Sequence, residues 1–263
     1  MTPQKPIVVL PPKPKGDVQA VAKRLAGELH CPLQSRRGRT ISAVFRDGFD
    51  AVLAVSLDDV SYYTSPGEEP FRFHPGMAKN RIGSLLRGEP ETLVRAADLK
   101  PGDSFLDATL GKATDALVAA HAVGDQGKVV GVEINPIVAA VVRIGLKRKA
   151  VPGKALAAAM LRIEVRQDHH LDALRAEADG AYDVVYFDPF FHQQVRGSVD
   201  MTPLRRIGVH DAIAADALDE AKRVARRSVV HKVRTDHDPP RPVADWELVE
   251  GNRRTGYRVW RMG

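Results

Sequence analysis

Residues 103–133 read DSFLDATLGKATDALVAAHAVGDQGKVVGVE, and the fold class follows from this stretch. Two short apolar runs, DSFLDA (103–108) and KVVGVE (128–133), have the length and composition of buried strands. Between them, residues 113–123 have the apolar spacing of a helix. A strand, a helix and another strand in this order predict a parallel sheet that is covered by helices.

The same alternation continues towards the C-terminus. We expect four further helices, over residues 136–149, 154–161, 170–178 and 211–227. We expect three further strands of this kind, IEVRQD (163–168), YDVVYFD (182–188) and SVVHKV (228–233). Residues 246–261 then read as an antiparallel hairpin, whereas a plain dinucleotide-binding fold ends on parallel strands. For residues 77–263 we therefore predict a Rossmann-like α/β domain with a seven-stranded sheet and a C-terminal antiparallel hairpin.

The N-terminal part of the chain has a less regular pattern, which predicts a small α/β accessory unit over residues 1–76. We expect helices over residues 17–30 and 39–47. The expected strands are IVVL (7–10), AVLAVSL (51–57), SYYT (61–64) and FRF (71–73). The segment HPGMAKNRIGSLLRG (74–88) predicts a helix that links this unit to the larger domain.

Composition and charge narrow the class of protein. The chain has 263 residues, of which 44% are hydrophobic and 27% charged, and it holds one cysteine, Cys31. No stretch approaches the ~20 apolar residues of a membrane span, so we expect a cytoplasmic protein without a disulfide framework. Residues 1–48 and 222–263 each carry a net charge of +6, and the residues between them carry −6. Basic flanks of this kind favour a polyanion such as a nucleic acid as partner, although they are also typical of solvated surface helices.

Four acidic residues end four consecutive strands of the predicted sheet: Asp107, Glu133, Asp168 and Asp188. Parallel sheets of this class bind ligands at the edge where those strand ends meet. Glu133, after the second strand, is placed to accept hydrogen bonds from both hydroxyls of a ribose. Carboxylates near the first loop would repel a pyrophosphate, so the pattern favours a positively charged nucleoside, S-adenosylmethionine (SAM). The alternative is that these acids only cap the helices that follow.

A second motif, Asp188-Pro189-Phe190-Phe191, follows the most apolar strand. Pro189 has no N–H and releases the strand end from the ladder. Asp188 and the Pro189 carbonyl can then accept hydrogen bonds from an exocyclic amine, and a phenylalanine can stack on its base. The alternative is a strand-to-loop turn with two core phenylalanines.

Three segments carry a resemblance to a known family: DATLGKATDAL (107–117), VVGVEINPIVAA (129–140) and VVYFDPFF (184–191). They resemble class I SAM-dependent methyltransferases, and more narrowly the RsmJ-like rRNA guanine-N2 methyltransferases with their uncharacterised bacterial relatives. The resemblance covers about residues 70–235 and implies the sheet order 3-2-1-4-5-7-6. Ala113 stands where the family has a second loop glycine, and Phe190 stands where it usually has methionine.

The resemblance implies a role for individual residues. Thr114 and Asp115 would open the helix that faces the methionine end of SAM, Glu133 and Ile134 would flank ribose and adenine, and Asp188 would face the target amine. The expected cofactor site comprises Asp107, Gly111, Thr114, Asp115, Glu133, Ile134, Asp168 and His169. The expected catalytic residues are Asp188, Pro189, Phe190 and Phe191.

The function predicted in this way is methyl transfer from SAM to an exocyclic amine of a nucleic-acid base, guanine N2 of rRNA. A methyltransferase for a DNA adenine, a protein or a small-molecule amine remains an alternative. A non-catalytic SAM-binding, RNA-binding module is another, and Ala113 is its sequence support. The loop arginines Arg36, Arg37 and Arg39 are candidates for substrate phosphate, or are simply solvated. The histidines lack metal-ligand spacing, so we expect no metal site. Since no apolar stretch is long enough to span a bilayer, we expect no membrane contact either.

Overall fold

The computed structural model describes residues 4–189, 213–235, 245–252 and 255–263, which form two compact units. The larger unit holds a seven-stranded sheet in the order β7-β6-β5-β8-β9-β11-β10. Strands β5 to β9 run parallel, and β11 runs antiparallel to both of its neighbours. The strands are β5 (Ser104–Asp107), β6 (Lys128–Glu133), β7 (Ile163–Gln167), β8 (Tyr182–Phe187), β9 (Ala225–Arg234), β10 (Trp246–Asn252) and β11 (Thr255–Arg261). The predicted fold class, sheet order and C-terminal hairpin are thus confirmed.

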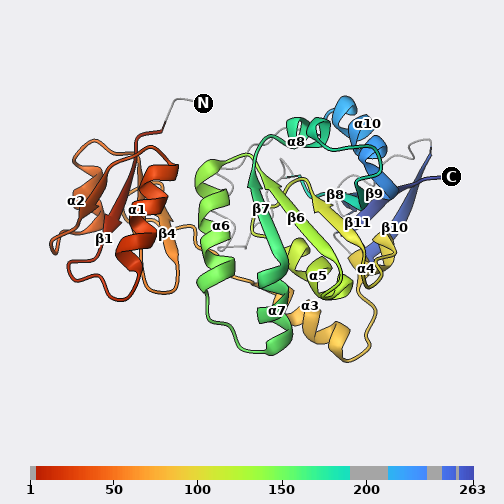
Figure 1. The fold of residues 1–263 in the computed structure, drawn as a ribbon, viewed down its shortest axis with the longest axis horizontal. Coiled ribbons are helices and arrows are strands. Elements are labelled where there is room, and N and C mark those ends of the chain that lie inside the picture. Colours follow the sequence, from red (N-terminus) through yellow and green to blue (C-terminus); the bar gives the residue numbers. More distant parts are fainter. Residues whose placement is uncertain (1–3, 190–212, 236–244, 253–254) are drawn as a thin grey trace. The chain divides into compact units, whose positions relative to one another are not determined.

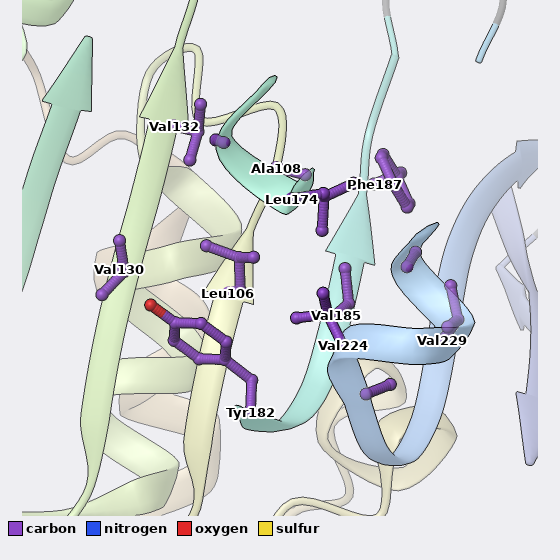
Figure 2. Close-up of a cluster of buried hydrophobic side chains, with 13 residues drawn as sticks. Leu106, Ala108, Val130, Val132, Leu174, Tyr182, Val185, Phe187, Val224 and Val229 are labelled. Atoms are coloured by element: carbon purple, nitrogen blue, oxygen red, sulfur yellow. The ribbon is translucent and has the colours of Figure 1, made fainter. Parts of the chain in front are cut away.

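Helices cover both faces of this sheet (Figure 1). Helices α8 and α10 pack on one face, where Leu174 of α8 and Val224 of α10 join a cluster with Leu106 and Val185 of the strands (Figure 2). Helices α4 and α5 contact the opposite face, and α3 and α7 pack against α5. The helices are α3 (Met77–Leu86), α4 (Thr92–Ala97), α5 (Thr114–Val123), α7 (Lys154–Arg162), α8 (His170–Ala176) and α10 (Ala215–Val224).

The helix expected over residues 211–227 is too long in that prediction. Helix α10 ends at Val224 and β9 begins at Ala225. Arg226 ion-pairs with Asp183, and Arg227 pairs with Asp103 at 2.5 Å. Asp183 lies in β8 and Asp103 directly precedes β5, so these partners from distant parts of the chain favour an extended backbone. Residues 211–212 lie outside the described part of the chain.

The smaller unit has its own four-stranded sheet, in the order β2-β1-β3-β4. Its strands are β1 (Pro6–Leu10), β2 (Leu33–Ser35), β3 (Ala51–Val55) and β4 (Val60–Tyr63), and its helices are α1 (Val18–Glu28), α2 (Ile41–Phe45) and α6 (Pro136–Arg148). The short strand β2 and helix α4 of the larger unit were not expected. The expected strand FRF is reduced to one bridge between Phe71 and Tyr62.

Contacts divide the chain after His74, but they also assign residues Pro136–Ala150, which include α6, to the smaller unit. Gly145 of α6 lies so close to Phe73 that a Cβ atom there would overlap its ring. Arg148 and Lys149 form ion pairs with Asp17 and Asp59 of the same unit. This small α/β unit therefore includes a helix that the sequence places between β6 and β7. Among the described helices, none is long and apolar enough to cross a bilayer.

Candidate active site

The loop between β5 and α5 is held against the sheet by backbone hydrogen bonds. The N–H of Leu110 donates to the Val132 carbonyl at 2.9 Å, and the N–H of Gly111 donates to Oε2 of Glu133 at 3.1 Å. Gly131 of β6 allows this approach, because a Cβ atom there would overlap the Leu110 side chain. The loop backbone is therefore ordered by the strand next to it.

Ala113 ends this loop in the left-handed conformation, with φ of 61°. Glycine adopts this region without steric cost, whereas an L-residue with a Cβ atom is strained by about 1–2 kcal/mol. The loop thus keeps at Ala113 a backbone conformation that suits the glycine expected there. Helix α5 begins directly after it, at Thr114.

A pocket opens at the carboxyl ends of these parallel strands, which is where sheets of this class bind their ligands. Its walls are apolar side chains together with a few polar groups. The lining residues are Ala108, Thr109, Val132, Glu133, Ile134, His169, His170, Asp188, Pro189 and Ile213.

Glu133 supplies a buried carboxylate at the end of β6. Its Oε1 accepts from the N–H of Asn135 at 2.8 Å, and its Oε2 accepts from Gly111. Burial raises the pKa of Glu133, and the two backbone donors oppose that shift. Each carboxylate oxygen has a second lone pair. A carboxylate with spare lone pairs beside apolar walls fits a nucleoside whose ribose offers two hydroxyl donors.

A row of polar side chains crosses the sheet on the face that carries α5. Strand register pairs Asp107 of β5 with Tyr186 of β8, and Lys232 of β9 with Tyr257 of β11. Phe187 pairs with His231, so Asp188 follows beside Lys232. Because side chains alternate between faces, Tyr186, Asp188 and Lys232 lie on the same face.

Asp115 of α5 is buried at the centre of this polar row, with a side chain 5% exposed. It accepts hydrogen bonds from Arg81 of α3 at 2.5 Å, from Lys232 at 3.0 Å and from the Tyr186 hydroxyl at 2.8 Å. Burial alone would raise the pKa of Asp115, but the charges of Lys232 and Arg81 outweigh it and hold the pKa well below its usual value. Asp115 is thus an ionised anchor, and donors of the protein itself bind both of its oxygens.

Asp188 shares the ammonium group of Lys232 with Asp115. Its Oδ2 accepts from the Lys232 Nζ at 2.8 Å, and its backbone N–H donates to the Thr109 hydroxyl oxygen at 2.6 Å. Burial raises the pKa of Asp188 to about 6; Lys232 opposes the shift and the negative charge of Asp115 adds to it. The side chain is nevertheless 31% exposed and lines the pocket. A carboxylate of this kind titrates close to neutral pH and is reachable by a ligand.

Asp107 is the most deeply buried of these acids, at 2% exposure. It accepts a hydrogen bond of 3.0 Å from the N–H of Thr109. Burial, with the charges of Asp115 and Asp188, raises the pKa of Asp107 well above its usual value. Together the polar row holds three acids, Asp107, Asp115 and Asp188, against the two bases Arg81 and Lys232.

Some of the predicted site residues line the pocket in the structure, and others do not. Glu133, Ile134, His169, Asp188 and Pro189 line the pocket, whereas Asp107, Gly111, Thr114, Asp115 and Asp168 do not. Asp168 accepts from the N–H of His169, whose Nδ1 in turn accepts from the Leu171 N–H at the start of α8. Phe190 and Phe191 lie outside the described residues.

Sequence analysis missed four polar residues of this region: Thr109, Arg81, Tyr186 and Lys232. The sequence contains a signal for Lys232, because a lysine inside the apolar run SVVHKV would be buried and would need an acidic partner. Arg81 had none, since its partner Asp115 is 34 residues away. In the part of the chain that the structure describes, no three His, Cys, Asp or Glu side chains gather as metal ligands.

The arginines of the smaller unit form a turn between β2 and α2. Arg37 and Gly38 both have positive φ, at 47° and 82°. Arg39 pairs with Asp47 at 2.7 Å and also donates to the Ala43 carbonyl. Within the described residues, Arg36 and Arg37 have no such ion pair, and Arg37 is exposed.

Comparison with known proteins gives a family match. A family model for SAM-dependent methyltransferases matches residues 71–240. The uncharacterized protein YpiP of Bacillus subtilis is 39% identical over 220 residues, which are 84% of this chain and 85% of that protein. In structure, the chain is similar to the SAM-dependent methyltransferase NGO1261 of Neisseria gonorrhoeae, with a TM-score of 0.64 and 16% identity over 97% of this chain and 95% of the other. At that identity the likeness concerns the fold.

Two further relatives are named for a substrate. Ribosomal RNA small subunit methyltransferase J of Coxiella burnetii is 30% identical over 164 residues, and that of Haemophilus ducreyi is 33% identical over 158 residues. These matches cover 60% and 58% of this chain, and 62% and 61% of the relatives. The chain therefore spans less than two thirds of the length of either methyltransferase.

Proposed function

The chain belongs to the SAM-dependent methyltransferase family, and we propose that its acceptor is an exocyclic amine of a nucleic-acid base, guanine N2 of ribosomal RNA. One observation carries this proposal: Asp188 and Pro189 line the same pocket as Glu133. An acceptor for an amine and a carboxylate for a ribose thus face one cavity. The similarity to two rRNA methyltransferases supports the choice of RNA.

The cofactor is SAM, which supplies an activated methyl group on a sulfonium sulfur. In this proposal Glu133 accepts hydrogen bonds from the ribose hydroxyls. Val132, Ile134 and Ile213 provide the apolar walls for the adenine. Asp188 is the acid of the polar row that lines the pocket, so its ionised form would favour the positive charge of the methionine end.

Asp188 acts on the acceptor. Its carboxylate accepts a hydrogen bond from the exocyclic amine and, with the Pro189 carbonyl, orients the nitrogen lone pair towards the pocket. Most of the rate enhancement then comes from positioning. The nitrogen must lose a proton after transfer, and a carboxylate whose pKa is about 6 can accept it. A base must leave its stack, or come from a single strand, to reach this position.

The smaller unit would bind the RNA outside the active site. The net charge of +6 over residues 1–48 and the turn at Arg36 and Arg37 support this role, since arginine pairs with phosphate oxygens in a bidentate way. An rRNA substrate and a single cysteine also favour a cytoplasmic enzyme. Methylation of a DNA adenine, a protein or a small-molecule amine remains the alternative at the same site.

The non-catalytic alternative loses its support in the structure. Ala113 was the reason to suspect a degenerate cofactor pocket, yet its backbone has the left-handed conformation that suits the family's glycine. Asp188 is intact and lines the pocket.

The test is to incubate the protein with methyl-labelled SAM and, separately, with total RNA, DNA, protein extract and a metabolite fraction. Small ribosomal subunits from cells that lack the enzyme serve as the specific substrate. We expect label in the RNA, recovered after nuclease digestion as N2-methylguanosine by mass spectrometry. Label in another fraction, or on another base, would contradict the guanine N2 assignment.

A further inference from the structure

Lys232 is a cation that bridges two carboxylates of the active site, those of Asp115 and Asp188. Its Nζ lies 3.0 Å from Oδ2 of Asp115 and 2.8 Å from Oδ2 of Asp188. Its side chain is 19% exposed. A lysine in such a place has little freedom, because leaving either carboxylate would strand a buried charge.

We propose that Lys232 is a positioning residue for methyl transfer, which fixes one oxygen of Asp188 so that the other is presented to the acceptor amine. The inference rests on the proposed role of Asp188. It adds Lys232 to the active site, and it gives the ion pairs around Asp115 a function, which is to hold Lys232 in place.

The first argument is geometric. Both described side-chain bonds of Lys232 go to carboxylate oxygens, and the bond to Asp188 goes to Oδ2. The N–H of Asp188 is held at the same time by the Thr109 hydroxyl oxygen. The backbone of Asp188 is thus held by one bond to the loop after β5, and its side chain is held by one bond from β9. Such fixation from two sides is what a reacting group needs to keep its orientation.

The second argument concerns the anchor of Lys232. Asp115 also receives Arg81 on its Oδ1 and the Tyr186 hydroxyl on its Oδ2, so two donors besides Lys232 hold this carboxylate in place. Arg81 is in turn paired with Glu91 at 2.6 Å. Lys232 is therefore attached to a rigid partner on one side and to the reactive carboxylate on the other.

The third argument is electrostatic. Asp188 lies near two other acids, Asp115 and Asp107, and Lys232 is the cation bonded to it among the described residues. Removing that charge disfavours the ionised form, which is the form that accepts a hydrogen bond from an amine. The titratable and charged groups around Asp188 are Lys232, Asp115, Asp107 and Tyr186, with Arg81, Glu91 and Tyr257 behind them and His169 and His170 across the pocket.

The test compares pH profiles of kcat/KM for the wild type, Lys232→Met, Lys232→Gln and Lys232→Arg. A neighbouring opposite charge lowers a carboxylate pKa by about one to three units. In Lys232→Met and Lys232→Gln, the acidic limb of the kcat/KM profile should therefore move to higher pH by about that amount. For a two-unit shift, the activity at pH 7 should fall about tenfold. Activity should recover at pH 9. Lys232→Arg should keep its limb near that of the wild type.

Two controls separate positioning from a general loss of structure. Lys128→Met removes an exposed strand lysine over the Tyr182 ring and should leave the profile unchanged. The dissociation constant for SAM should change by less than about threefold in the Lys232 variants. A uniform loss of activity with an unmoved limb, or no loss at all, would overturn the proposal.

A second measurement does not depend on turnover. Infrared titration of the Asp188 carboxylate, identified by difference from Asp188→Asn, should show the same upward shift in Lys232→Gln. An unshifted carboxylate would refute the role of Lys232. The identity of the labelled RNA base tests the proposed acceptor separately, so each of the two ideas can fail alone.

Discussion

The backbone N–H of Asp188 donates a hydrogen bond of 2.6 Å to the hydroxyl oxygen of Thr109, which joins the end of β8 to the loop after β5 at the pocket. Thr109→Val keeps the side-chain volume but leaves this N–H without its acceptor, at a cost of ~1–3 kcal/mol. We expect kcat to fall by more than the affinity for SAM, because Asp188 loses an anchor. Thr109→Ser should restore most of the turnover. Steady-state kinetics with calorimetry would decide, and wild-type kcat in Thr109→Val would remove Thr109 from the site.

Glu133 offers a test of the ribose assignment. Glu133→Ala should weaken SAM binding by ~1.5–3 kcal/mol, since the ribose no longer has a charged hydrogen-bond acceptor. Part of this effect would come from the loop, because Gly111 and Asn135 also lose their acceptor. Glu133→Gln keeps an acceptor oxygen and should bind with intermediate affinity.

Isothermal titration calorimetry measures both Glu133 variants. Glu164→Ala, on the neighbouring strand with a side chain 55% exposed, is the matched control and should bind SAM normally. Unchanged affinity in Glu133→Ala would contradict the ribose contact, and melting curves must show that the variants are folded.

Asp188→Ala should abolish methyl transfer far more than it reduces SAM binding, since the carboxylate contacts the acceptor. In the wild type the pKa of Asp188 is raised to about 6, and the ionised form is the one that accepts the amine hydrogen. Activity should therefore fall as the pH drops through about 6. Asp172→Ala, at an exposed position of α8, is the control. An equal loss of affinity and turnover in Asp188→Ala would show that the acceptor role is wrong.

The turn at Arg36, Arg37 and Arg39 tests the role of the smaller unit. Replacing all three by alanine should weaken RNA binding and flatten its salt dependence. Each arginine that no longer binds a phosphate lowers the log–log slope by ~0.7 on single strands. Because Arg39 is paired with Asp47, we expect the double variant of Arg36 and Arg37 to account for nearly all of the change. SAM affinity should not change, and equal slopes for wild type and triple variant would exclude the turn from the RNA path.

Asp107 should lower the stability of the free protein at neutral pH. Burial raises its pKa well above the usual value, so its contribution to stability is present at low pH and is lost as the pH rises through the folded pKa. Asp107→Asn is neutral at every pH and can still accept from the Thr109 N–H. We expect the variant to be more stable than the wild type in urea at pH 8, with the difference vanishing towards pH 4. A variant that is less stable at pH 8 would contradict this.

The predicted strands agree with the structure wherever a single apolar run carries the whole signal. KVVGVE and YDVVYFD are buried on both faces of the sheet, so their composition alone distinguishes them from loops. The acids that end them were predictable for the same reason. Their position follows from the strand and needs no knowledge of contacts.

The features that the sequence could not predict all depend on partners distant in the chain. Arg226 and Arg227 lie in a strand because Asp183 and Asp103 are beside them in the folded sheet. Asp115 was expected near the methionine end of SAM, but Arg81, Tyr186 and Lys232 occupy its oxygens. Local patterns carry no information on such pairs, so a candidate ligand and an internal anchor have the same appearance in sequence.

The close approach of Leu110 to Gly131 has a consequence for the thermodynamics of cofactor binding. The N–H groups of Leu110 and Gly111 already tie the loop after β5 to the Val132 carbonyl and the Glu133 side chain of β6, so the loop has little conformational entropy left to lose when a ligand arrives. SAM binding then requires no slow ordering of this loop, and the entropic cost of such ordering does not weaken the affinity. A substitution at Gly131 would act from beneath the loop, by converting a preorganised cofactor site into one that must be assembled at each encounter.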